Sequence, residues 1–166
     1  YEDDPVLSQP TLHCSMTVLG TVHTVLRGTA QPLSHLDGRP GGLSAIAKSA
    51  VAGAVHAGPL GLEGDMQADL RVHGGPDKAL HQYPYEHYAA WQSELGDLAA
   101  LDQCGAFGEN LSSIGMTEQT LCLGDVVRLG SVTLVLTQTR QPCWKLNSRF
   151  GRADMARRVQ TTGRTG

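Results

Sequence analysis

A cysteine with cationic neighbours is the residue of this chain best suited to chemistry. Cys143 lies in the segment Arg140-Gln141-Pro142-Cys143-Trp144-Lys145. Positive charges this close are expected to favour the thiolate, the form that attacks electrophiles and binds soft metals. Because Pro142 has a fixed φ and disfavours helix at the preceding residue, we expect a strand that gives way to a shaped loop carrying the sulfur. The sulfur is therefore a nucleophile, a metal ligand or a side chain that only fills space.

The segment around Cys143 is also the basic part of the chain. Residues 140–166 contain 7 Lys and Arg and one Asp (net +6), whereas residues 1–139 contain 6 Lys and Arg and 15 Asp and Glu (net −9). Such a patch predicts an anionic ligand. A solvated helix face would explain Arg157 and Arg158 but not Arg140 and Lys145. Nucleic acid is not expected as a partner, because the whole chain is acidic and poor in aromatic residues.

A second candidate stretch is His73-Gly74-Gly75-Pro76-Asp77-Lys78. Gly74 and Gly75 permit a close backbone approach to a ligand or a positive φ, and Lys78 adds a cation that suits a phosphate or a polar cofactor. The spacing is not that of a nucleotide P-loop. A tight turn between two strands explains the glycines equally well.

Histidines and a carboxylate supply further candidates. His73, His81 and His87, with Glu86, do not have the spacing of a compact zinc motif, so zinc is a weak hypothesis. We expect His81 on a strand and His87 on the following helix, both as surface or half-buried side chains. His73 adjoins the glycine pair and is a candidate hydrogen-bond donor, general acid or loop brace.

The stretch Gly105-Ala106-Phe107-Gly108-Glu109-Asn110-Leu111 surrounds a carboxylate with glycines. Glu109 is expected to be partly enclosed and to pair with a cation such as Arg140. Asn110 is a partner in that site or a turn cap. Cys122 lies in an apolar run and is predicted to be a small buried side chain.

Composition sets the frame in which these residues must be placed. The chain has 166 residues, of which 40% are hydrophobic and 17% charged, as expected for one folded domain. It contains no apolar run long enough to cross a bilayer, and its acidic start, Tyr1-Glu2-Asp3-Asp4, is unlike a secretory signal. Scattered cysteines without a CxxC pair predict reduced thiols and a cytoplasmic location.

Local patterns predict a strand-rich domain with a few helices. Gly124-Asp125 and Gly130-Ser131 are hairpin signals, and Gly163 is a helix stop. Tyr88, Trp91 and Leu95 share one helix face and are predicted core residues. Expected strands are 16–24, 43–51, 121–123, 126–129 and 132–137, and expected helices are 84–95 and 153–161. The fold class predicted is mainly β with peripheral helices, as a β-barrel or mixed sheet.

Taken in order, these motifs resemble a MOSC domain, in particular its YiiM-like bacterial branch. The resemblance runs from about Leu43 to Gly166 and rests on the segments 73–79, 83–88, 105–111, 124–125 and 140–146. It implies a single β-barrel domain over residues 1–166. Members of this branch continue with a closing strand and often a three-helix extension, which we expect to be absent from this chain.

The resemblance also implies molybdenum chemistry. In such a domain Cys143 would be the protein ligand to molybdenum in the molybdenum cofactor, Mo-molybdopterin, with His73 supplying a proton or orienting the cofactor. The implied reaction is the detoxifying reduction of N-hydroxylated compounds such as 6-hydroxylaminopurine, with electrons from an external flavin-containing reductase. The remaining residues implied in cofactor binding are Arg140, Lys145, Lys78, Gly74, Gly75, Glu109 and Asn110.

Three other functions remain open for the same cysteine. A sulfur carrier would use a Cys143 persulfide and would not depend on molybdenum. A thiol hydrolase would need the His73 imidazole within hydrogen-bond reach of the sulfur. A non-catalytic module would bind molybdopterin and reduce nothing.

Overall fold

A computed structural model of the chain describes residues 16–70 and 72–166. Its largest sheet has four strands in the order β4-β1-β8-β7. The central strands β1 (Thr21–Arg27) and β8 (Leu111–Ile114) are antiparallel, β4 (Ser49–Ala50) is antiparallel to β1, and β7 (Gln82–Pro84) is parallel to β8. The residues just before β7 and β8 therefore emerge at the same end of the sheet, which places His81 beside Asn110.

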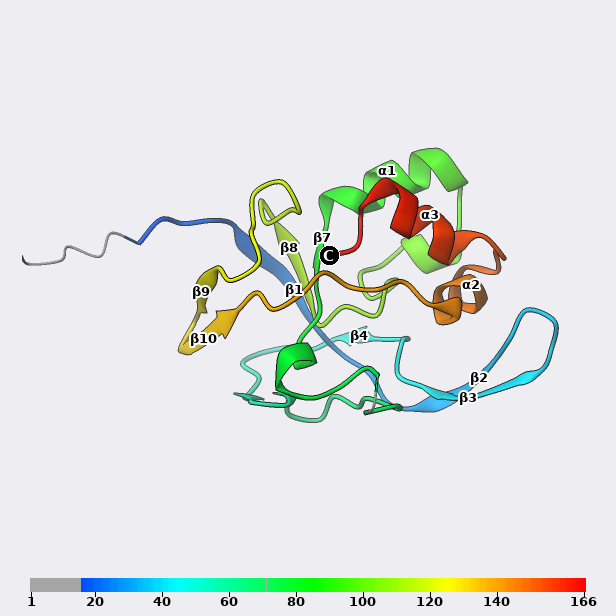
Figure 1. Ribbon diagram of the computed structural model, residues 1–166, viewed down its shortest axis with the longest axis horizontal. Coiled ribbons are helices and arrows are strands. Elements are labelled where there is room, and N and C mark those ends of the chain that lie inside the picture. Colours follow the sequence, from blue (N-terminus) through cyan, green and yellow to red (C-terminus); the bar gives the residue numbers. More distant parts are fainter. Residues whose placement is uncertain (1–15, 71) are drawn as a thin grey trace, which may run out of the picture.

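Three short hairpins surround this sheet (Figure 1). They pair β2 (Gln31–Ser34) with β3 (Pro40–Ser44), β5 (Ala57–Gly58) with β6 (Gly61–Leu62), and β9 (Val126–Leu129) with β10 (Val132–Val135). The predicted hairpin at Gly130-Ser131 is confirmed, with Gly130 at a φ of 57°. The glycine-rich segment 38–42 lies within the β2–β3 hairpin, and the segment 58–61, which contains Pro59, lies within the β5–β6 hairpin.

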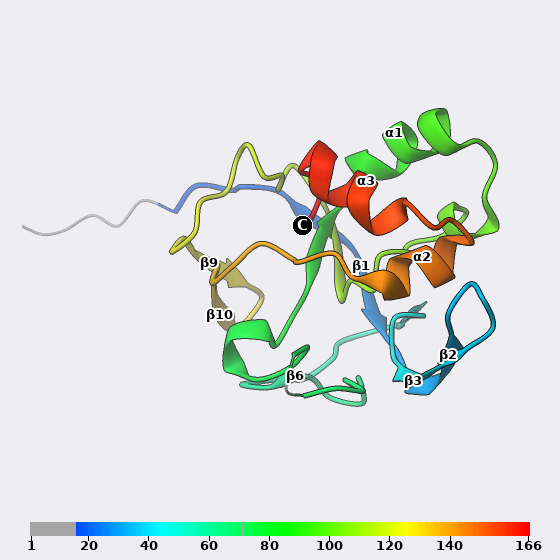
Figure 2. The same cartoon turned by 45° about the vertical axis from the view of Figure 1, so that its right-hand side comes forward.

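The helices gather on one side of the molecule, as the two views in Figures 1 and 2 agree. They are α1 (Glu86–Leu95), α2 (Trp144–Phe150) and α3 (Met155–Thr162). The chain also forms short 3₁₀ turns at Pro76–Lys78 and Ala99–Leu101. The predicted helices 84–95 and 153–161 are confirmed as α1 and α3, each beginning two residues later than expected. Gly163 ends α3 in the left-handed conformation, as predicted.

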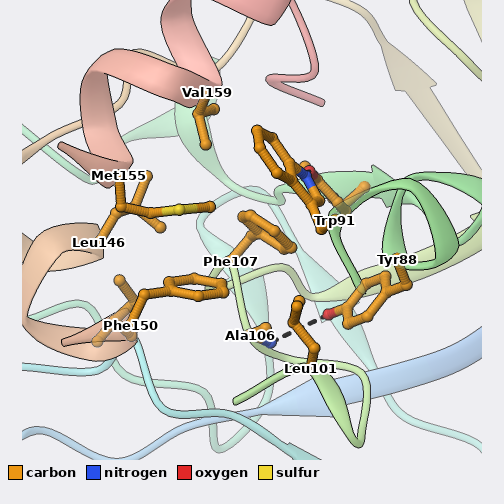
Figure 3. Packing of buried hydrophobic residues seen from close by; sticks show 11 residues of the cluster. Tyr88, Trp91, Leu101, Ala106, Phe107, Leu146, Phe150, Met155 and Val159 are labelled. Carbon is orange, nitrogen blue, oxygen red and sulfur yellow. Dashed lines mark hydrogen bonds between the residues drawn. The ribbon is translucent and has the colours of Figure 1, made fainter. Parts of the chain in front are cut away.

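The hydrophobic core lies between these helices and the strand β7. Phe107 is at its centre, stacked on Tyr83 with ring centroids 4.2 Å apart and in contact with Trp91 and Phe150 (Figure 3). Tyr88 and Trp91 are buried as predicted, and Leu95 packs at the edge of the cluster. The aromatic core holds α1, α2 and the loop before β8 against one another, and so fixes the start of α2.

Several expectations from the sequence are wrong. The strands of residues 16–70 and 72–166 do not close into a barrel, because the four sheets are separate and Pro or Gly occurs in half of the strands. The expected strand 121–123 is instead a turn in which Asp125 accepts a hydrogen bond from the Cys122 amide at 2.8 Å. Cys122 is therefore exposed, not buried. The helix α2, which begins directly after Cys143, was not expected. Tyr1–Asp4 and Cys14 lie outside the described residues.

We expect Phe107→Ala to lower the free energy of unfolding by about 3–5 kcal/mol, because it removes the ring at the centre of the core. Urea unfolding followed by tryptophan fluorescence measures this loss. The matched control is Leu60→Ala, which truncates a side chain 66% exposed in a turn and should change stability by less than about 0.5 kcal/mol. Equal losses in the two variants would contradict this description of the core.

Candidate functional site

A cleft of about 990 Å³ lies along the segment that connects β10 to α2. This segment, residues 136–143, crosses the molecule in both views and passes close to the C-terminal residue (Figure 2). Apolar side chains of Leu121, Leu123, Val135 and Leu136 form part of the lining. The polar part of the lining includes His73, Lys78, His81, Arg140, Cys143 and Lys145.

Cys143 is placed by the start of α2. It is the N-cap residue of that helix in an extended conformation, with its carbonyl accepting the Leu146 amide at 3.0 Å. The next residue, Trp144, stacks on His35 with ring centroids 3.8 Å apart. A Cβ atom at Gly41 would collide with the Trp144 ring, so glycine is required there. The β2–β3 hairpin therefore holds Trp144, and with it the half-buried Cys143 sulfur in the cleft wall.

Arg140 is a buried cation beside this sulfur. Burial lowers the pKa of Arg140, whereas the charges of Cys143 and Glu109 oppose that shift. Its backbone amide donates to the Gly166 carbonyl at 3.1 Å, and its Nη1 contacts His81 Nδ1 at 3.2 Å. Its Nε is buried without a hydrogen-bond partner among the described residues. A buried guanidinium nitrogen without a partner is costly, and an anion in the cleft would satisfy it.

His81 is half-buried, as the sequence suggested, and both of its ring nitrogens have partners. Its Nε2 lies 3.2 Å from the Thr165 carbonyl, and its Nδ1 faces Arg140. Burial, with the nearby charge of Arg140, lowers the pKa of His81 to about 3, so the ring is neutral at pH 7. Sequence reasoning gave His81 no role, since its partners lie 59 and 84 residues away along the chain.

His73 and the lysines complete the polar lining of the cleft. Burial and the charges of Lys145 and Arg140 lower the pKa of His73 to about 4, which keeps this imidazole neutral at pH 7. Lys78 is exposed and donates from Nζ to the Val72 carbonyl at 2.8 Å. Among the described contacts there is no hydrogen bond between the His73 ring and the Cys143 sulfur. The arrangement therefore favours a site that binds an anion beside the sulfur over a catalytic pair in which His73 activates Cys143 as a nucleophile.

The two glycines after His73 are explained by different constraints. A Cβ atom on Gly74 would lie 2.7 Å from Gln67 Oε1 and 2.8 Å from Leu70 Cδ2, so these two side chains would have to shift to admit it. Gly75 has a φ of 92°, which favours glycine, and it begins the 3₁₀ turn Pro76–Lys78. Neither glycine lines the cleft itself.

Glu109 lies behind the cleft wall, fully buried. Its carboxylate accepts hydrogen bonds from the Tyr88 hydroxyl and from the amides of Gly105 and Phe107, at 2.7 and 3.1 Å for the amides. The predicted pairing of Glu109 with Arg140 takes the form of a charge interaction, with no direct ion pair between them among the described residues. Burial beside this carboxylate raises the pKa of Tyr88.

Asn110 belongs to a buried polar network that sequence reasoning missed. Its Nδ2 donates to Asp65 at 2.8 Å, and its Oδ1 accepts the His81 amide at 3.2 Å. Asp65 is also paired with Lys48, whose Nζ lies 2.6 and 2.8 Å from its two carboxylate oxygens. Burial lowers the pKa of Lys48, although Asp65 opposes the shift. The only sequence signal was an acidic residue in the glycine-rich stretch 61–69.

Glu118 forms a second polar contact at the cleft. It accepts a hydrogen bond from His87 Nε2 at 2.8 Å and another from the Gly166 amide at 2.8 Å. Burial alone would raise the pKa of Glu118, but these hydrogen bonds lower it to about 2. His81 and His87 therefore have separate partners. Within residues 16–70 and 72–166 no group of three or more His, Cys, Asp or Glu side chains is arranged to hold a metal ion.

Comparison with known proteins identifies relatives of this arrangement. Residues 69–166 match the family described as MOSC domain. Protein YiiM from Escherichia coli is 46% identical over 83% of this chain and 60% of its own length. Protein YflK from Bacillus subtilis is 50% identical over 63% of this chain and 46% of its own length. A protein from Gibberella moniliformis named "Reductase" is 40% identical over 74% of this chain and 22% of its own length.

Solved structures give the same result for the fold. The structure of YiiM from Escherichia coli matches with a TM-score of 0.63 at 38% identity, over 83% of this chain and 60% of that one. YiiM from Geobacillus stearothermophilus matches with a TM-score of 0.68 at 29% identity, over 89% of this chain and 65% of that one. The chain thus spans less than two thirds of these relatives.

We expect the free energy of unfolding to fall as the pH drops from 6.5 toward 3. In this range His81 becomes protonated in the unfolded chain but stays neutral in the folded chain, where its pKa is about 3. This group alone contributes a slope of up to about 1.4 kcal/mol per pH unit in that window. Urea unfolding of the unmodified chain and of His81→Asn between pH 7 and pH 4.5 measures it. The variant should have the shallower slope, whereas His56→Gln, at an exposed histidine, should leave the slope unchanged. An unaltered slope in His81→Asn would contradict the assignment.

Proposed function

This chain belongs to the MOSC domain family, and we propose that its cleft binds the molybdenum cofactor, with Cys143 as the protein ligand to the metal. The observation that supports this most directly is the placement of one sulfur beside a buried cation that lacks a full set of partners. We further propose that the domain reduces N-hydroxylated compounds, of which 6-hydroxylaminopurine is an example. The printed name of the Gibberella relative, "Reductase", agrees with this class of reaction.

The residues present fit such a cofactor in charge and in ligand type. Molybdopterin carries a phosphate, and the cleft presents Arg140 and Lys145 next to Cys143, with Lys78 also in the lining. A thiolate is the ligand that a soft metal centre prefers. Molybdopterin brings sulfur ligands of its own, so one cysteine is a sufficient contribution from the protein. The orphaned Arg140 Nε would gain a partner from the bound anion.

The cofactor, when bound, supplies two-electron chemistry by which an N–OH group, two protons and two electrons give N–H and water. Cys143 would hold the metal, and Arg140 and Lys145 would hold the phosphate. His73 is neutral near pH 7, so it would orient substrate or cofactor by a hydrogen bond from its ring N–H more readily than as an imidazolium acid. The apolar side chains in the lining would exclude water around an organic substrate.

The residues behind the wall would act indirectly. Glu109 keeps a negative charge near Arg140, and Asn110 orders the backbone of His81. Gly74 and Gly75 shape the loop that carries His73, since Gly75 has a positive φ and Gly74 packs against the Gln67 and Leu70 side chains. Electrons would come from an external flavin-containing reductase. We propose that the reaction takes place in the cytoplasm. In residues 16–70 and 72–166 no helix is both long enough and apolar enough to traverse a membrane.

Cys143→Ser should lower the molybdenum content at least about tenfold relative to the unmodified chain, because a hydroxyl is a poor ligand for a soft metal. The measurement is molybdenum per chain by mass spectrometry, after purification from cells that make the cofactor. Cys122→Ser is the matched control, since this cysteine is exposed and outside the cleft lining. Full retention of molybdenum by Cys143→Ser would refute the metal-ligand assignment.

The protein loaded with cofactor should reduce an N-hydroxylated purine when a reduced viologen dye supplies the electrons. Cys143→Ser should lose at least about a hundredfold in rate, because the metal would be lost or mispositioned. Turnover is followed by chromatography of the amine product. Molybdenum binding without turnover would favour a non-catalytic module. Cyanide-labile sulfur on Cys143 without molybdenum would favour a sulfur carrier.

A further inference from the structure

The geometry points to His81 as a positioning residue that holds the Arg140 guanidinium where it binds anions beside Cys143. This inference rests on the proposed function in one respect, namely that the cleft is an anion site. It adds a residue that makes no contact with the metal or the substrate and acts only through Arg140.

The hydrogen bonds of His81 define a single tautomer. The Thr165 carbonyl can only accept, so His81 Nε2 must carry the proton and donate to it across 3.2 Å. A guanidinium can only donate, so His81 Nδ1 must be the free lone pair that accepts from Arg140 Nη1 across 3.2 Å. The neutral ring satisfies both partners at once. The other tautomer would oppose two donors at Arg140 and two acceptors at Thr165.

The surroundings of the ring enforce this arrangement. The cations Arg140 and Lys48 both oppose a positive charge on His81. Tyr83 packs against the ring edge to face, with centroids 6.1 Å apart. The His81 backbone is also held, since its amide donates to Asn110 Oδ1 and its carbonyl accepts the amides of Asn110 and Leu111. The ring is thus a rigid acceptor placed by β7 and β8.

A rigid acceptor on one side of a guanidinium determines where its remaining donors point. Arg140 donates one Nη1 hydrogen bond to His81 Nδ1, and its backbone amide donates to the Gly166 carbonyl. Its Nε is left without a protein partner among the described residues, and the side chain lines the cleft. Without His81 Nδ1, Arg140 would keep its charge but lose this fixed orientation, and the anion site beside the sulfur would weaken.

Two substitutions separate the acceptor from the rest of the ring. In His81→Asn the side-chain oxygen is bonded to Cγ, as Nδ1 is in histidine, so an acceptor for Arg140 is retained. In His81→Gln the terminal nitrogen is one bond further out, where Nε2 lies, so the donor to Thr165 is retained and the acceptor is lost. Both variants are uncharged and neither can titrate. A purely structural role would make no distinction between the two positions of the polar atom.

The readout is the ratio of alkylation rates of Cys143 by iodoacetate and by iodoacetamide at pH 7, resolved by peptide mass spectrometry. The same thiolate attacks both reagents, so the ratio cancels the ionised fraction and reports binding of the iodoacetate carboxylate by the cations near the sulfur. We expect the unmodified chain and His81→Asn to agree within about twofold, and His81→Gln to fall about tenfold, as Arg140→Gln should, because a charge-assisted hydrogen bond is lost. The exposed Cys122 in the same sample is the internal control, whose ratio should not change.

Equal ratios in His81→Asn and His81→Gln, whether both high or both low, would overturn the assignment. If urea unfolding shows that either variant is not folded, nitrogen-15 NMR spectra of the unmodified chain test the proposal instead. They must show His81 protonated at Nε2 only. A proton on Nδ1 would overturn the proposal. None of these measurements requires molybdenum. If the His81 variants behave alike but Cys143→Ser loses molybdenum, the role of His81 is refuted and the proposed function stands. If the His81 variants differ as expected but Cys143→Ser keeps its molybdenum, the role of His81 stands and the metal-ligand assignment is refuted.

Discussion

The burial of polar and charged side chains behind the cleft is the constraint on which the rest of the structure depends. Lys48 and Arg140 are cations largely removed from water, a cost that is offset only by partners of good geometry. Those partners are Asp65 for Lys48 and neutral His81 for Arg140, and Asn110 joins the two pairs. The network therefore requires that the starts of β7 and β8, the turn after β6 that carries Asp65 and the segment before α2 all meet at one end of the sheet.

The same constraint explains why a domain of short, separate sheets with a few helices can hold a defined cleft. Among the described residues no hairpin strand pairs with a strand of the main sheet, so side-chain contacts help to set the positions of the hairpins. Asp65 ties the β5–β6 region to the sheet through Asn110 and the Gly28 amide. Trp144 ties the β2–β3 hairpin to α2. The cleft lies between these ties, and the aromatic core around Phe107 supports the helices that form its other side.

Local signals in the sequence were sufficient for α1, α3 and the β9–β10 hairpin, because apolar residues at helical spacing, a glycine stop and a two-residue turn act within a few positions. They were sufficient also to single out Cys143, Arg140 and His73, which the structure brings to one cleft. They failed for Cys122, whose apolar run was read as a strand although Asp125 turns the chain there. They could not reveal the Lys48–Asp65–Asn110–His81 network, whose members are 17 to 45 residues apart and meet only in the folded chain.

Three consecutive carbonyls, those of Arg164, Thr165 and Gly166, accept hydrogen bonds from the Tyr83 hydroxyl, the His81 ring and the Arg140 amide. Every one of these contacts is made by the main chain of residues 164–166, so the identity of the first two side chains is not what the cleft recognises. The Arg164 side chain is used elsewhere, since it pairs with Glu94 at 2.7 Å and lies over the Trp91 ring. Alanine at position 164 or 165 would leave all three acceptors in place, whereas a Cβ atom at Gly166 would collide with the Gln82 carbonyl oxygen and would displace the backbone.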